Sequence, residues 1–165
     1  MITVDTSALL KDLEKLHKDV VRRLENVVSG FAYEFILILG SNTPIGDEEA
    51  IQRVGRYRSA YKLRMERIGI DMHAGYHQGS WQFSLDTNLG FSPLITDVQS
   101  SANDGRNFAQ SSYRLGEPFY IGANTPGMEA LEFGYSPQAP DGISDISIQQ
   151  MMQTYQIDVL KYYKE

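Results

Sequence analysis

A long helical pattern near the start of the chain constrains the fold more than any other feature. Between residues 6 and 39, apolar residues recur at steps of three and four, the periodicity of one apolar helix face. This face comprises Leu9, Leu13, Leu16, Val20, Leu24, Val27, Phe31, Phe35 and Ile38. A helix of about 34 residues is ~50 Å long, which exceeds the core of a small domain. We therefore expect either a kink at Gly30 or one end that leans on something outside this chain.

The ends of this helix and the later elements follow from local signals. Asp5 or Thr6 is expected to cap the start, and Gly40 to follow the end in a left-handed conformation. Further along the chain, the patterns predict a second helix over 47–68, a strand over 80–87, a loop over 88–101, a helix over 104–115, a strand over 119–121, a helical turn over 128–133 and a C-terminal helix over 147–163. The prediction is one α+β domain over residues 1–165, with the long helix at about 6–39. This helix should pack on a small, mainly antiparallel sheet.

Composition excludes several kinds of site. The chain has 165 residues, 42% hydrophobic and 22% charged, as expected for a globular domain. It has no cysteine, so disulfides and thiolate metal sites are excluded, which suits a reducing cytoplasm. The most apolar window, 27–39, is shorter than the ~20 residues that a bilayer requires. We therefore expect a buried helix segment there and no membrane partner.

The charge of −6 is unevenly distributed along the chain. Residues 1–70 hold 11 basic and 10 acidic side chains, whereas residues 71–165 hold 4 and 11. Since affinity for nucleic acid comes mainly from neutralising phosphates, the acidic half disfavours DNA binding. Arg53, Arg56 and Arg64 belong to a basic stripe on the predicted second helix. Such a stripe is usually a solvated face, and the next interpretation is contact with an acidic protein surface.

Candidate metal and catalytic residues are few. His73 and His77 are four apart, but the glycines around them do not indicate a helix, and a solvated loop is the better interpretation. Glu129 and Glu132 could form the carboxylate pair that glycoside cleavage needs. No saccharide-binding cluster accompanies them, so a structural role for Glu132, bonded to loop amides or to a neighbouring subunit, is favoured. We predict no metal, no cofactor and no catalytic residue.

Three segments carry a resemblance to a known family. Residues 118–143 combine a short strand, an Asn-bearing turn, a Leu-Glu-Phe-Gly step and a Gln-Ala-Pro segment ending at Gly142. The positions concerned are Tyr120, Ile121, Asn124, Pro126, Leu131, Glu132, Phe133, Gly134, Gln138, Ala139, Pro140 and Gly142. Together with a Thr-Pro turn at 41–45 and a Gly-x-Trp start of a strand at 79–84, this order resembles the tail-completion (neck) proteins of tailed phages, the minor tail protein Z type included. The chain departs from the pattern in the insertion at 47–76 and in Gly127, where many members carry an aromatic residue.

The resemblance implies a non-enzymatic virion protein that is assembled in the host cytoplasm. It would form a six- or twelve-fold homo-oligomeric ring at the head–tail junction, joining the head-closure ring to the tail terminator while DNA passes without specific binding. The expected interface residues are Glu132, Phe133, Tyr135, Gln138, Pro140, Arg53, Arg56 and Arg64. The alternatives are a small phage-encoded cell-wall hydrolase using Glu129 or Glu132, and a tail-tube or adaptor protein.

Overall fold

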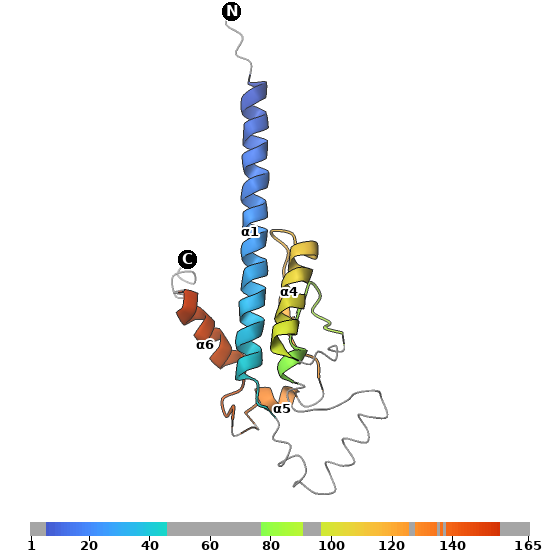
Figure 1. The fold of residues 1–165 in the computed structure, drawn as a ribbon, viewed down its shortest axis with the longest axis vertical. Coiled ribbons are helices and arrows are strands. Elements are labelled where there is room, and N and C mark those ends of the chain that lie inside the picture. The colour runs from blue at the N-terminus through green and yellow to red at the C-terminus, as the bar shows by residue number, and fades with distance from the viewer. Residues whose placement is uncertain are drawn as a thin grey trace, which may run out of the picture.

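The computed structural model describes residues 6–45, 77–90, 97–125, 128–134, 136 and 138–155. Its elements are α1 (Ser7–Asn42), the 3₁₀ turn η1 (Gln78–Ser80), β1 (Gln82–Ser84), α4 (Val98–Ser112), β2 (Tyr120–Gly122), α5 (Met128–Glu132) and α6 (Ser144–Tyr155) (Figure 1). Helices pack beside a small antiparallel sheet, so the α+β class is confirmed. The second helix, predicted over 47–68, lies outside the described residues.

Helix α1 is continuous, and its N-terminal half projects well beyond the rest of the described fold (Figure 1). It passes through Gly30 without interruption, so of the two sequence alternatives the kink is wrong. Thr6 stands at the N-cap, but its side chain makes no capping hydrogen bond. By length and composition α1 is also apolar enough to cross a membrane, a test that core helices pass as well. The sequence-based expectation that residues 27–39 are too short to cross a bilayer counted only this apolar run. The whole helix is longer.

The core face of α1 differs from the apolar face that periodicity predicts. The buried residues are Ser29, Ala32, Ile36, Leu39 and Gly40, which are mostly small and lie under α4. Along the predicted face, Phe31, Phe35 and Ile38 are only partly buried, and the residues from Leu9 to Val27 are exposed. Close approach of two helices is possible where small residues such as Ser29, Ala32 and Gly40 face the neighbouring helix, and these residues do not stand out in an apolar periodicity.

Gly40 illustrates this close contact. It lies inside α1, which continues to Asn42, so its predicted place after the helix is wrong. A side chain at position 40 would overlap Val98 and come within 2.9 Å of the carbonyl oxygen of Gln78. The glycine is therefore needed because α4 and η1 approach α1 here, and not because the backbone turns left-handed.

Helix α4 begins earlier than its sequence pattern predicts, since residues 98–101 are helical and not part of a loop. Asp97 caps this helix, because its Oδ1 atom accepts a hydrogen bond from the Ser100 amide at 2.8 Å. The hydrogen bonds from the Ser100 backbone and side chain lower the pKa of the Asp97 carboxyl group. The buried residues of α4 are Ser101, Ala102, Gly105 and Ala109. This face consists of small residues and lacks large apolar side chains, which explains why the sequence pattern does not reveal the start of α4.

The two strands pair antiparallel around an aromatic cluster. Phe83 of β1 lies opposite Ile121 of β2 and stacks on Phe119, with ring centroids 5.2 Å apart. Tyr113 meets both phenylalanine rings edge-on. Strand β1 is shorter than the predicted 80–87, because Ser84 turns to bond Asp86 through its side chain.

Candidate protein-interaction site at the base of the long helix

The base of α1 brings together segments that are far apart in the sequence. The Trp81 indole Nε1 donates to the Thr43 hydroxyl at 2.8 Å, and that hydroxyl donates to the Leu39 carbonyl at 2.7 Å. The Gln78 amide donates to the Thr43 carbonyl at 3.1 Å. Thr43 and Trp81 are both buried. The Thr-Pro turn and the Gly-x-Trp segment are therefore joined through one satisfied polar network.

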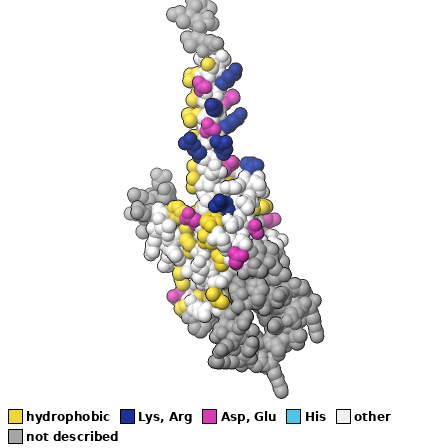
Figure 2. All heavy atoms as spheres, in the orientation of Figure 1, with side chains coloured by type: hydrophobic (Ala, Val, Ile, Leu, Met, Phe, Trp, Pro, Cys, Tyr) yellow, Lys and Arg dark blue, Asp and Glu magenta, His cyan; other side chains and the backbone are white. Residues whose placement is uncertain are grey.

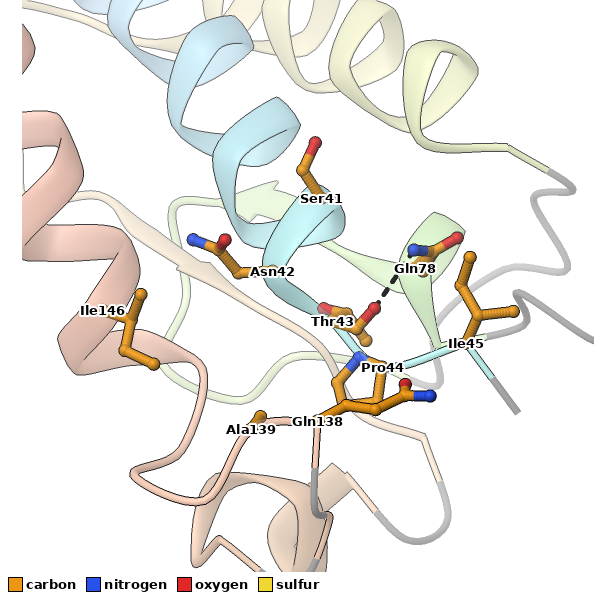
Figure 3. A pocket seen from close by; sticks show the side chains of 9 residues that line it. All are labelled: Ser41, Asn42, Thr43, Pro44, Ile45, Gln78, Gln138, Ala139 and Ile146. Atoms are coloured by element: carbon orange, nitrogen blue, oxygen red, sulfur yellow. Dashed lines mark hydrogen bonds between the residues drawn. The ribbon is translucent and has the colours of Figure 1, made fainter. Parts of the chain in front are cut away.

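A hollow of about 440 Å³ opens beside this network (Figure 3). Its walls come from the end of α1, from η1, from the Gln-Ala-Pro segment and from α6. The lining residues are Ser41, Asn42, Thr43, Pro44, Ile45, Gln78, Gln138, Ala139 and Ile146. Apolar side chains and uncharged amides share these walls, and charged side chains are likewise depleted from the cores of protein interfaces.

Helix α6 forms one wall and is fixed to α1 near both of its ends. The Asn42 side-chain amide donates to Ser147 at 3.0 Å and to Gln150 at 3.1 Å. Near the other end of α6, the Tyr155 hydroxyl donates to the Glu34 carboxylate, which raises the pKa of Tyr155 to about 12. These bonds connect this wall to α1.

Glu132 supports the same wall from α5. Its carboxylate accepts from the backbone amides of Ile143 at 3.3 Å and of Ser144 at 3.1 and 3.2 Å. These are the free amides at the N-terminus of α6, where a negative charge also suits the helix dipole. The predicted bonding of Glu132 to loop amides is confirmed.

Two glycines fold the intervening loop back on itself. Gly134 and Gly142 have positive φ angles of 75° and 84°. A side chain at Gly134 would overlap the Pro140 carbonyl, and one at Gly142 would overlap the Glu132 carbonyl. This compact loop brings Gln138 and Ala139 to the hollow.

Of the predicted interface residues, four are described by the structure and four are not. Phe133 is 72% exposed, Gln138 and Pro140 are exposed, and Glu132 is half-buried under α6. The structure thus brings Gln138 to the Thr-Pro turn and leaves Phe133 on the surface. Tyr135, Arg53, Arg56 and Arg64 lie outside the described residues, so their interface role stays a prediction.

His77 is part of the packing beside the hollow. Its Nδ1 atom lies 2.8 Å from the Thr125 hydroxyl, and burial lowers the pKa of the imidazole. His73 lies outside the described residues. Within the described ranges, no three residues of the His, Cys, Asp or Glu types gather in a way that could hold a metal ion.

Several lining residues were missed by sequence reasoning. Gln78 and Ile146 have no predicted role, and Asn42 enters only as part of the Thr-Pro turn, although these three residues form three walls of the hollow. Uncharged side chains carry no chemical signature of their own, and only the fold brings these three together. Comparison of the chain with models of protein families, with curated proteins and with solved structures finds no match.

Proposed function

We propose that this chain is a structural protein of a tailed phage that forms a homo-oligomeric ring at the head–tail junction. In this role it joins the head-closure ring to the tail terminator and leaves a passage for DNA. The observation that carries the proposal is that Thr43 and Gln138 line one hollow, while Trp81 donates a hydrogen bond to the Thr43 hydroxyl behind it. These residues belong to the three sequence segments on which the resemblance to neck proteins rests.

The surface at this hollow suits a contact between proteins. Phe133 offers a large apolar side chain that is 72% exposed, close in sequence to Gln138 on the wall of the hollow. Exposed aromatic side chains of this kind commonly anchor interfaces when a neighbour covers them. We propose that the loop at 133–140 docks on an adjacent subunit or an adjacent ring.

The hydrolase alternative is less well supported by the geometry. Both carboxylate oxygens of Glu132 are occupied by backbone amides at the start of α6. A general acid needs a free position from which to reach the leaving group. Glu132 is thus assigned to holding α6, which leaves Glu129 without a catalytic partner at this position.

Electron microscopy of the purified full-length chain tests the proposal. We expect closed rings in wild type and their loss in Phe133→Ser, with Leu115→Ser as a control at another exposed apolar residue that lies outside the loop. Antibody labelling of intact virions should place the chain at the neck. Cell-wall cleavage by the wild-type protein that is abolished in Glu129→Gln would overturn the proposal.

A further inference from the structure

The projecting half of α1 carries an uncovered apolar stripe. The exposed stripe is defined as Leu9, Leu13, Leu16, Val20, Leu24 and Val27, whose side chains are 43% to 66% exposed. Figure 2 shows apolar side chains along one edge of this half and charged ones along the other. Leu10 lies at the edge of the stripe and is 57% exposed.

The stripe continues a pattern that is covered elsewhere on the same helix. Apolar residues repeat every eleven positions, as in Leu9, Val20 and Phe31, or in Leu16, Val27 and Ile38. Eleven residues make about 3.67 per turn, close to the helix's own period, so the stripe runs almost straight along α1. The last members of the repeat, Phe31, Phe35 and Ile38, are partly buried, and the Phe31 ring lies 6.2 Å from the Phe119 ring. The exposed stripe, from Leu9 to Val27, is equally apolar but stays exposed among the described residues.

Helix α6 packs over the C-terminal end of the apolar repeat of α1. It contacts α1 at Glu34 and Asn42, and Ile38, the last member of the repeat, lies between them on the same face. In a parallel pair of α1 helices, the two α6 helices would stand between them. In an antiparallel pair, each projecting half would end before the partner's α6. The fold therefore favours the antiparallel arrangement.

The charges beside the stripe favour a second copy of the chain over a membrane or nucleic acid. Residues 11–25 hold five basic and four acidic side chains. Helices that lie on anionic membranes, and surfaces that bind phosphates, are strongly basic on the polar face. A nearly neutral mixture of both signs lets identical helices approach without net repulsion.

We propose that the exposed stripe packs against the same stripe of a second copy in an antiparallel helix pair. From Leu9 to Val27 the stripe is ~27 Å long. Two such stripes, with the flanking side chains, would bury on the order of 1,000 Å², which is the size that a specific interface needs. This pairing is independent of the proposed neck function, which uses the opposite end of α1.

Analytical ultracentrifugation of the full chain tests the pairing. Wild type should sediment as a dimer or a multiple of it, and the triple variant Leu13→Gln, Leu16→Gln, Val20→Gln should raise the dissociation constant by roughly 100-fold. The matched control, Lys11→Gln, Lys15→Gln, Lys18→Gln, changes the opposite face and should associate like wild type. Circular dichroism should give both variants the wild-type helix content, because the substituted side chains are exposed in the fold. A monomeric wild type, or a triple stripe variant that associates normally, would overturn the proposal.

Disulfide trapping tests the antiparallel orientation of the pair. Because the chain has no cysteine, only the introduced cysteines can form a disulfide. In a mixture of Leu9→Cys and Val27→Cys chains, the antiparallel pair should give the mixed disulfide. Leu9→Cys alone should remain unlinked. Homodimers linked through residue 9 would overturn the antiparallel arrangement. Binding of a monomeric chain to phosphatidylcholine vesicles, if abolished in the stripe variant, would overturn the pairing in favour of a membrane surface.

Discussion

Thr43 is the residue on which the base of the molecule most depends. Its hydroxyl accepts from Trp81 and donates to Leu39, and both Thr43 and Trp81 are buried. Replacing Thr43 by Val keeps the shape but leaves the indole N–H without this acceptor. We expect a loss of about 1–3 kcal/mol in the free energy of unfolding. Urea titration followed by tryptophan fluorescence measures it, and Trp81 is the only tryptophan. Thr43→Ser, which keeps the hydroxyl, should lose less; equal losses in both variants would contradict this account.

His77 makes stability depend on pH. Burial lowers its pKa below the ordinary value of 6.5, so the unfolded chain binds the proton more readily than the folded one. The contribution is therefore fully present above pH 6.5 and is lost as pH falls through the folded pKa. Urea titrations at several pH values should show a smaller decrease on acidification in His77→Gln than in wild type. The pKa of Asp97 is also lowered, but from the ordinary value of 3.8, so Asp97 affects stability only at a more acidic pH than His77 does.

Glu132 and Glu129 are two carboxylates of α5 with different surroundings. Glu132 bonds the first amides of α6, whereas Glu129 is exposed. Glu132→Ala should lower the free energy of unfolding by about 1–2 kcal/mol, while Glu129→Ala should change it by less than about 0.5 kcal/mol. Thermal unfolding followed by circular dichroism compares them. Similar small effects for both would mean that the α6 cap contributes little.

At the scale of elements, two glycines of α1 should respond in opposite ways to alanine. A methyl group added at Gly30 would meet no other atom within 4 Å, so Gly30→Ala should stabilise the helix by about 0.5–1 kcal/mol. Gly40→Ala would press on Val98 and on the Gln78 carbonyl, and should cost about 1–3 kcal/mol. Urea midpoints of the two variants provide the comparison. A stabilised Gly40→Ala would mean that α4 can move away from α1 at little cost.

The same helices show how far sequence reasoning reaches. The extent of α1 and the positions of both strands follow from periodicity, because these elements carry large apolar residues at regular steps. The α1–α4 contact could not be found in this way, since Ala32, Gly105 and Ser101 pack by being small. The hollow also escaped prediction, because uncharged residues such as Gln78 and Asn42 acquire a role only once the fold assembles them.

At the scale of the whole molecule, two exposed surfaces lie at opposite ends of α1: the stripe on the projecting half (Figure 2), and the Phe133 loop, which follows α5 at the base (Figure 1). If the first makes helix pairs and the second makes ring contacts, each kind of contact can form without the other. Each surface should then be separable by mutation, because distant sites act independently.

The masses of the variants distinguish two interfaces from one. Phe133→Ser should stop assembly at the helix-paired dimer, whereas the triple glutamine variant of the stripe should lose the pairs but keep the contacts made by the loop. Combining all four changes should leave a monomer with wild-type helix content. Native mass spectrometry resolves these species directly. A monomer from Phe133→Ser alone would contradict the two-interface arrangement, since the stripe would then be unable to hold a pair without the loop.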